Sequence, residues 1–320
     1  MLGELIAILA VLTFVGSSVM FRKIEHEVSP IFINFFRTAI GTITFILITL
    51  FLNQLNLIII IPWELWLILI FSFVFGQVIG DTAYFSAQKE LGTTIALAIS
   101  MTFPLFTFIL SLVFLNKPFK LNLIFSLLLI GVGIIIIGKS KISPDNSSND
   151  TDSNGFHDMG RKTLIKAVGF CFTASLGWAI GAVMIEFATT RIAQIIQAEE
   201  LSSVIGNVIR FPFALLILSS MVWWENFSKK RNNTLTNNRK SLYTWSILIG
   251  ASIIGTSLGA YLYTESVHVA GADVVALIAS ASPLFALPLT YLINQEKISK
   301  FGFIGVILTI AGVMIIIIEF

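Results

Sequence analysis

Two stretches of the chain decide its fold, because the second repeats the pattern of the first 179 positions later. Residues 76–106 read GQVIGDTAYFSAQKELGTTIALAISMTFPLF, and residues 255–285 read GTSLGAYLYTESVHVAGADVVALIASASPLF. Two glycines four residues apart, a tyrosine, a third glycine and the triplet Pro-Leu-Phe occupy the same places in both. Apolar sequence would rarely reproduce this order by chance, so the pattern indicates a duplicated unit.

The duplication extends beyond these stretches. Asn34–Arg37 match Asn207–Arg210 with a shift of 173 positions. Phe14 matches Trp178 with a shift of 164 positions. Apolar runs between polar breaks predict ten spans, at residues 4–21, 31–52, 64–87, 93–115, 121–138, 164–186, 200–224, 244–267, 272–294 and 301–318.

The composition identifies the solvent of these spans as lipid. Of the 320 residues, 56% are hydrophobic and 12% are charged, and the mean hydropathy is +0.91. A soluble domain has about 25% charged residues. Runs of about 20 apolar residues match a hydrocarbon core about 30 Å thick, and in lipid the backbone must bond internally, so we expect helices. Runs such as Ile58–Ile61 lack the alternation of a lipid-facing barrel.

The repeat divides the chain into two units. Residues 1–138 form the first five-helix unit and residues 164–320 form the second. Residues 139–163 are a polar linker, rich in Ser, Asn and Asp, which we expect to be disordered. Because each unit has an odd number of spans, the second enters the membrane from the opposite side. The fold class predicted is therefore all-α, with ten transmembrane helices in two inverted repeats, a plan common among secondary transporters with a site near the midplane.

Charge and cysteine content exclude several classes of function. A net charge of +2 indicates no nucleic-acid partner. Cys171 is the single cysteine, so neither an internal disulfide nor a cysteine metal site can form. The histidines at positions 26, 157 and 268 are scattered, and we expect no metal or other cofactor. The apolar N-terminus lacks a preceding basic region, so we interpret it as a first span rather than a cleaved signal peptide.

Two prolines, Pro104 and Pro283, fall near the middle of matched spans. Proline lacks an amide hydrogen and frees the carbonyl four residues earlier, here at Ser100 and Ala279. The hydroxyl of Ser282 is close enough in sequence to bond such a carbonyl. The prolines therefore predict two bent helices, which either pack as simple kinks or line a central cavity.

Buried charges provide a second set of candidates. Arg37 and Asp81 lie at similar depth in antiparallel spans, and a charge at that depth is usually paired. We predict an Arg37–Asp81 pair, which is either structural or opened by the solute; snorkelling to the interface is the other reading. Ala260 occupies the place of Asp81 in the second unit, so Arg210 lacks this partner. An unpaired Arg210 could face a cavity and attract an anionic or zwitterionic group.

Aromatic and amide side chains complete the set. Phe14, Trp178, Tyr84 and Tyr263 are matched by the repeat and either line a cavity or serve packing and interfacial anchoring. Three further acids, Glu186, Glu265 and Asp273, lie near predicted span ends, where solvation or helix capping is usual. The candidates for solute binding or coupling are Asp81, Arg37, Arg210, Asn34, Gln77, Tyr84, Trp178, Tyr263, Ser100 and Ser282.

Small residues recur at helical spacing. Gly76–Gly80, Gly255–Gly259 and Gly177–Gly181 each place two glycines on one helix face, and Thr13–Ser17 is the match of the last pair. Small residues let helix backbones approach closely in lipid. We expect these positions to mark helix contacts.

Taken together, these residues resemble the EamA family of the drug/metabolite transporter superfamily. The resemblance rests on the two five-helix units, the arginine in each second span, the Pro-centred fourth span and a last span that reads GFIGVILTIAGV at residues 302–313. It implies alternating access and movement of small metabolites such as amino acids or nucleobases, often by proton exchange. Members often carry a glutamate after the fourth and ninth spans; here Glu296 follows the ninth, but Lys117 stands after the fourth.

We therefore expect a secondary transporter of a small organic metabolite, such as an amino acid or similar polar solute, in the plasma membrane. The partners are that solute and membrane lipid, and the sequence is compatible with a monomer or a homodimer. The alternatives are a non-transporting scaffold or channel and a membrane-embedded lipid-modifying enzyme. The chain lacks HExxH, which argues against a metalloprotease of that type. GTSLG at residues 255–259 fits GxSxG, and GIIIIGKS at residues 133–140 fits GxxxxGK[ST]. Both lie in or at the end of predicted membrane spans and not between a strand and a helix, as those motifs require, so neither favours a hydrolase or direct use of ATP.

Two arguments give opposite orientations of the chain in the membrane. Loops 22–30, 88–92, 139–163, 228–241 and 295–300 share one side and hold most of the basic loop residues, so the positive-inside rule places the termini outside. The resemblance implies cytoplasmic termini. A reporter fused to Phe320 decides between them.

Overall fold

A computed structural model provides the structure of the protein. It describes residues 2–117, 161–231 and 241–294, with isolated positions between 124 and 136 and between 304 and 315. Residues 139–160 of the linker, half of the predicted fifth span, two-thirds of the predicted tenth span and most of the loop 228–241 lie outside the described residues. Eight of the ten predicted spans can therefore be compared with the structure.

The described elements are all helical. In the first half they are α1 (Leu2–Arg22), α2 (Pro30–Phe51), α3 (Leu55–Ile60), α4 (Trp63–Phe73), η1 (Val74–Asp81), α5 (Thr82–Leu91), α6 (Thr93–Ser100) and α7 (Phe103–Phe114). In the second half they are α9 (Arg161–Ile196), α10 (Glu199–Arg231), α11 (Leu242–Ser252), η2 (Ile253–Leu258), α12 (Gly259–Ala270), α13 (Ala272–Ala279) and α14 (Ser282–Asn294). Six helical runs are long and apolar enough to cross a membrane, and α13 with α14, bent by 41°, forms a seventh. The predicted multi-pass helical fold is confirmed.

The sequence explains where several helices begin. Ser29 caps α2, since its hydroxyl accepts from the Phe32 amide at 3.2 Å, and Pro30 follows in the first turn, where it needs no hydrogen-bond partner. Ser241 caps α11 in the same way, with a bond of 3.1 Å from the Thr244 amide.

Two predicted boundaries were wrong. The sixth span was predicted to end at residue 186, but α9 continues to Ile196. Its extra turns bury Ala188 and Ile192 completely, so tertiary packing extends the helix beyond the predicted apolar span. The seventh span was predicted over 200–224, whereas α10 reaches Arg231. The short helix α3 lies in a segment predicted as a loop.

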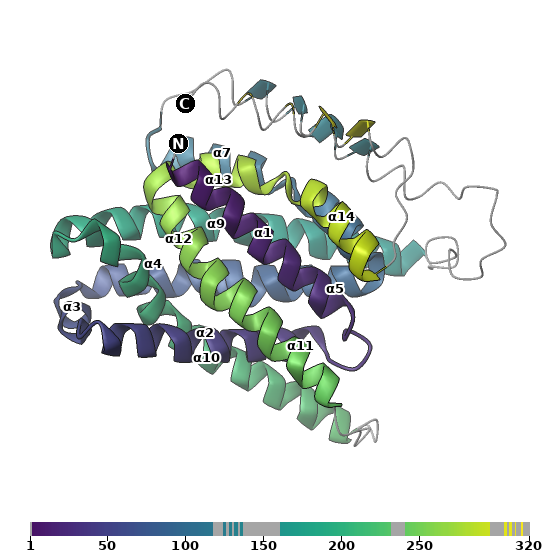
Figure 1. Cartoon of the computed structure of the whole chain (residues 1–320), viewed down its shortest axis with the longest axis horizontal. Helices are drawn as coiled ribbons and strands as arrows, with labels where there is room; N and C mark the ends of the chain where they lie inside the picture. Colours follow the sequence, from purple (N-terminus) through teal and green to yellow (C-terminus); the bar gives the residue numbers. More distant parts are fainter. Residues whose placement is uncertain are drawn as a thin grey trace.

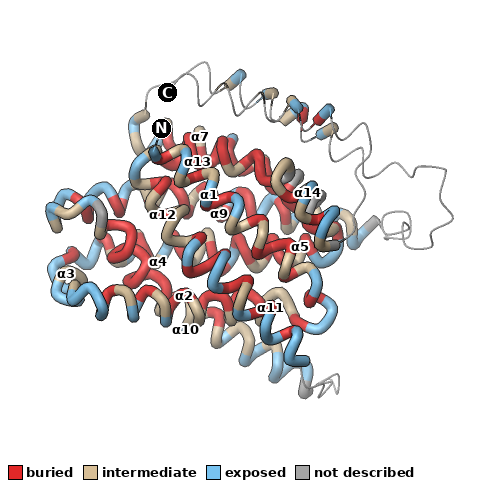
Figure 2. The backbone as a smooth tube through the Cα atoms, viewed as in Figure 1, coloured by how far each residue is buried: buried red, intermediate tan, exposed pale blue. Residues whose placement is uncertain are grey.

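The two halves interlock. The first helix of each half packs against the third span of the other half: α1 against α12, and α9 against η1. The second spans, α2 and α10, pack against each other. Figure 1 shows α1 and α12 side by side, crossing in front of α9. Figure 2 shows buried positions gathered within the bundle, while exposed positions lie on its outer surface.

The predicted small-residue contacts are confirmed. A Cβ on Gly177 would lie 2.5 Å from the Phe75 carbonyl oxygen, and one on Gly181 would lie 2.8 Å from that of Ser72. In the other half, a Cβ on Gly255 would overlap the Ser17 side chain. Glycine is required here because backbones or side chains of the opposite half occupy the space.

The third span of each half contains a π-helical segment that the sequence reading missed. η1 begins at Val74 and η2 at Ile253, which are equivalent in the repeat. Such segments widen the helix locally and are frequent at functional sites. Both lie where the two halves meet.

The fourth and ninth spans are broken rather than bent. Pro104 stands in the first turn of α7, after α6 has ended at Ser100. Pro283 is likewise the second residue of α14, after α13 has ended at Ala279. Proline is tolerated in a first turn, so the chain restarts the helix there instead of kinking it.

Candidate functional site

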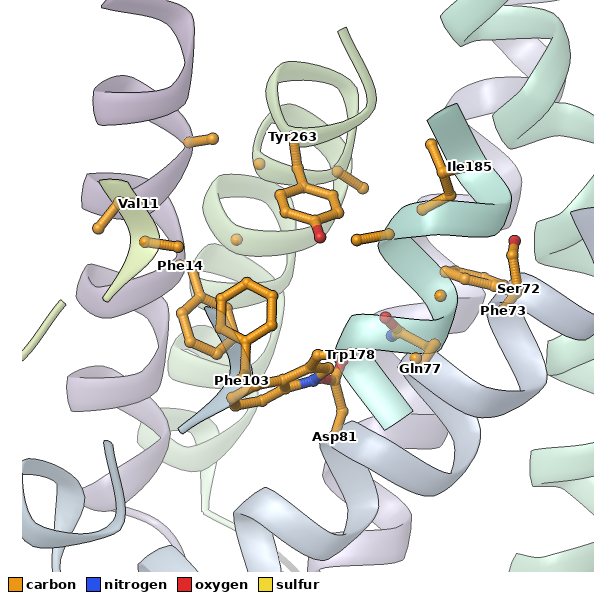
Figure 3. A pocket seen from close by; sticks show the side chains of 18 of the residues that line it. Val11, Phe14, Ser72, Phe73, Gln77, Asp81, Phe103, Trp178, Ile185 and Tyr263 are labelled. Atoms are coloured by element: carbon orange, nitrogen blue, oxygen red, sulfur yellow. The ribbon is translucent and has the colours of Figure 1, made fainter. Parts of the chain in front are cut away.

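A cavity of about 140 Å³ lies between the two halves. A single water needs a cavity of roughly 10–15 Å³, so this cavity has room for a small organic molecule. Equivalent residues of the repeat line it in pairs: Arg37 and Arg210, Phe14 and Trp178. Both π-helical segments and both breaks also contribute, and Figure 3 shows the side chains converging from several helices. The cavity therefore lies at the interface of the duplicated units.

The predicted Arg37–Asp81 pair is present at the cavity wall. Nη1 of Arg37 is 3.0 Å from Oδ2 of Asp81, and both side chains are almost fully buried. Trp178 donates from Nε1 to the other carboxylate oxygen at 2.7 Å. Nε of Arg37 donates to the Thr256 hydroxyl at 2.8 Å. Both oxygens of Asp81 are thus occupied by groups of the protein.

Arg210 is buried without an acidic partner among the residues that the structure describes. Its Nε and Nη2 donate to Oδ1 of Asn207 at 3.0 and 2.6 Å, and Nη2 also donates to the Thr264 hydroxyl at 2.7 Å. Its guanidinium carbon is 4.7 Å from the ring centre of Phe73. Nη1 is buried with no hydrogen-bond partner. The prediction that Arg210 lacks the Asp81-type partner and faces a cavity is confirmed.

Gln77 lines the cavity, and Asn34 holds it from behind. Nε2 of Gln77 donates to Oδ1 of Asn34 at 3.1 Å, while Nδ2 of Asn34 donates to the Gln77 backbone carbonyl at 2.7 Å. That carbonyl belongs to the π-helical segment, so the amide pair stabilises the widened turn. Asn34 does not itself line the cavity, and its part in solute binding or coupling stays a prediction.

Three of the four predicted aromatics line the cavity. Phe14, Trp178 and Tyr263 project into it in Figure 3. The rings of Phe14 and Trp178 meet edge to face at 5.9 Å, as expected for matched residues near the axis of an inverted repeat. Tyr84 is fully buried behind them, with its ring centre 5.4 Å from that of Trp178, so of the two roles left open for it the structure shows packing. Gly80 is needed in front of Trp178, since a Cβ there would come within 2.9 Å of the indole.

The polar groups at the breaks are largely internal. Ser175 donates to the freed carbonyl of Ser100 at 2.7 Å, and Ser282 bonds the carbonyl of Ala279 as predicted. Ser282 lines the cavity, but Ser100 does not. The breaks therefore bring Ser282, Met101 and Phe103 to the cavity without exposing unpaired carbonyls at these two positions.

A charged cluster joins the two halves at one end of the bundle. Nζ of Lys117, just after α7, lies 2.7 Å from Glu186 and 2.5 Å from Asp273. Glu186 also accepts from the Ala272 amide at 2.6 Å and so caps α13. Burial alone would lower the pKa of Lys117, but the two carboxylates outweigh it and raise that pKa. Glu186 was predicted to lie near a span end, solvated or capping a helix; it lies well inside α9 and caps α13 instead.

The sequence analysis did not predict several residues of the site. Phe73, Thr256 and Thr264 contact the two arginines, yet none of them matches a like residue in the other half. The replacement of the usual glutamate by Lys117 was the one available sign of the charged cluster.

Comparison with known proteins agrees with this architecture. The profile of the EamA-like transporter family matches residues 1–139 and 165–318. A protein of Archaeoglobus fulgidus described as an uncharacterized transporter is 24% identical over 99% of this chain and 98% of its own length. A solved structure titled only as the crystal structure of a protein superposes with a TM-score of 0.69 at 15% identity, covering 99% of this chain and 96% of that chain.

The fold and the cavity between its halves define a multi-pass membrane transporter of the drug/metabolite type. The chain belongs to the EamA-like transporter family. Its partners therefore include a small-molecule solute and membrane lipid.

Proposed function

We propose that the protein is a secondary transporter that carries a small organic metabolite through the central cavity by alternating access. The observation that carries this proposal is the cavity between the two halves, which is lined by equivalent residues of both, Arg37 and Arg210 among them. Discontinuous helices that meet near the centre of an inverted repeat are typical of solute sites in such transporters. The cavity is lined by both breaks, which supports a solute path there.

Alternating access requires a contact that separates the cavity from one side of the membrane and that can break. The cluster of Lys117, Glu186 and Asp273 ties α7 of the first half to α9 and α13 of the second. Ile185, next to Glu186, lines the cavity, so the cluster lies within one helical turn of the cavity wall along α9. We assign this cluster as a gate at the end of the bundle where α7 ends and α13 begins.

A labelling experiment tests the gate. In a Cys171→Ser background, Ala182→Cys places a thiol in the cavity wall, and a membrane-impermeant maleimide added from the gate side measures access. We expect Lys117→Gln to increase the labelling rate several-fold. Arg191→Gln, an exposed substitution on α9 outside the cluster, serves as the control. Equal labelling in all three proteins contradicts the gate.

Asp81 is the candidate for proton coupling, because it is the acid among the described residues of the cavity lining. Its carboxylate holds Arg37 and Trp178 at once, so protonation would release both contacts. Asp81→Asn should abolish the dependence of uptake on a pH gradient while leaving downhill exchange. Uptake that is unchanged at every pH removes Asp81 from the mechanism.

Transport itself is tested with protein reconstituted in liposomes. A panel of metabolites is screened by thermal shift and by uptake, each with and without a pH gradient. We expect at least one solute both to stabilise the protein and to move across the membrane. If no solute binds or moves, a non-transporting scaffold becomes the better account; if lipid is chemically altered instead, a lipid-modifying enzyme does.

A further inference from the structure

The charge of the cavity wall is unbalanced. The charged side chains that line it, among the described residues, are Arg37, Arg210 and Asp81. Arg37 and Asp81 neutralise each other through the 3.0 Å contact. Arg210, which is 2% exposed, leaves one uncompensated positive charge in a largely apolar space. A buried charge without a counter-charge is costly, so a ligand that supplies one negative charge gains the most.

The protein binds two nitrogens of the Arg210 guanidinium and gives the third, Nη1, no hydrogen-bond partner. Asn207 and Thr264 accept from Nε and Nη2, which fixes the plane of the guanidinium. Phe73 covers one of its faces. Both hydrogens of Nη1 remain without a partner in a buried position. A pre-oriented guanidinium with a free end is suited to a carboxylate, because little side-chain freedom is lost on binding.

No free acid is available for an ammonium group in the described lining. Asp81 already accepts from Trp178 at one oxygen and from Arg37 at the other. The remaining lining is mostly aromatic and aliphatic, with Phe14, Met101 and Phe103 among its members. A zwitterionic amino acid would therefore bury its ammonium without a counter-charge, whereas an uncharged apolar body would fit.

We propose that the cavity selects a monoanionic carboxylate with an apolar body, whose carboxylate pairs with the guanidinium of Arg210 and satisfies Nη1 after a small side-chain shift that opens this atom to the cavity. This inference rests on the proposed transport function, since the same cavity carries the solute. It departs from the amino acids that the family resemblance implies, because the charge count of this chain disfavours an ammonium group. A dianion would leave one negative charge uncompensated, and a cation would be repelled by Arg210.

Four matched ligands test the selection. 3-Phenylpropionate, phenylalanine, phenethylamine and phenylsuccinate share a phenyl body and differ in charge. Binding to the purified full-length protein is measured by titration calorimetry and thermal shift. We expect 3-phenylpropionate to bind at least about tenfold more tightly than any of the others, which corresponds to one charge-assisted hydrogen bond. Aliphatic 3-methylbutanoate is included to test whether the body must be aromatic.

Substitutions locate the site. Arg210→Gln should weaken 3-phenylpropionate binding about tenfold or more, and Arg210→Lys should retain part of it. Arg191→Gln, the same change on the exposed surface of α9, should leave binding unchanged. Arg37→Gln, which frees Asp81, should shift the preference towards phenylalanine. Each variant must first elute as a single monodisperse species.

The outcomes separate this inference from the transport proposal. If phenylalanine binds as tightly as 3-phenylpropionate, or if Arg210→Gln binds like the wild type, selection of a monoanion by Arg210 is wrong, whatever the transport data show. If no monocarboxylate binds, the inference is also wrong. Uptake of another solute in the metabolite screen would then keep the transport proposal, and absence of all uptake would remove both.

Discussion

Arg37 and Arg210 occupy equivalent places in the two halves, yet their surroundings differ. Both arginines donate to a threonine hydroxyl and lie over a phenyl ring, but Arg37 has a carboxylate partner whereas Arg210 has the amide of Asn207. The exchange of Asp81 for Ala260 at equivalent positions accounts for the difference. Duplication built a symmetric cavity, and one divergent position made its charge asymmetric.

The largest effect is expected from Arg37→Gln. This change leaves Asp81 buried without its cation, and breaking a buried ion pair typically costs about 3–5 kcal/mol. The free energy of unfolding, measured by denaturant titration in detergent, should fall by that amount. Arg191→Gln should change it little. A loss below about 1 kcal/mol would show that water reaches the pair.

The next effect concerns Ala260→Asp, which gives the second half the acid of the first. We expect the new carboxylate to pair with Arg210 and to compete with an anionic ligand. Binding of 3-phenylpropionate should weaken about tenfold to a hundredfold, while protein stability is retained. Titration calorimetry measures the change, and Ala260→Asn, a change of nearly the same size without the charge, is the control and should weaken binding much less. Unchanged binding would contradict the equivalence of the two arginine sites.

The helix contacts of the two halves differ in a similar way. α9 offers glycines to η1, whereas α1 offers Thr13 and Ser17 to glycines of the second half. Gly255→Ala overpacks against Ser17 and should cost about 1–3 kcal/mol. Combining it with Ser17→Gly should recover most of the loss in a thermal-unfolding assay. Gly16→Ala meets no neighbouring atom within 4 Å and should be neutral in this respect.

A smaller effect is expected for Arg210→Gln. It removes a charge that has no counter-charge, together with hydrogen bonds that glutamine can partly replace. The free energy of unfolding should change by less than about 1.5 kcal/mol, well below the loss for Arg37→Gln. Equal losses in the two variants would mean that Arg210 has an ionic partner after all.

The smallest effect is expected at the gate. Lys117→Glu should lower stability by about 0.2–1 kcal/mol, because the lysine is partly exposed and solvent screens the charges. Adding Glu186→Lys should restore part of that loss in thermal unfolding. Because the carboxylates raise the pKa of Lys117, its contribution should be complete at neutral pH and should decline when the pH rises through that raised pKa. A decline starting below pH 8 would contradict this pairing.

Much of the architecture follows from the sequence alone. Hydrophobic runs longer than the bilayer thickness permit only helices, and their odd number in each copy implies inversion. The order of the spans also predicted the Arg37–Asp81 pair, because the antiparallel second and third spans place both side chains at one depth. These inferences need only the period of a helix and the cost of a bare charge in lipid.

The tertiary structure decided what each polar group contacts. Sequence alone could not show that Asn34 and Tyr84 stand behind the cavity, since rotation of a helix by one residue changes which face meets the neighbour. It could not show that the prolines restart broken helices, or that π-helical turns precede Thr82 and Gly259. It also could not bring Lys117 to Glu186 and Asp273, which lie 69 and 156 positions away. Such contacts depend on the packing of distant helices, and packing is a property of the whole bundle.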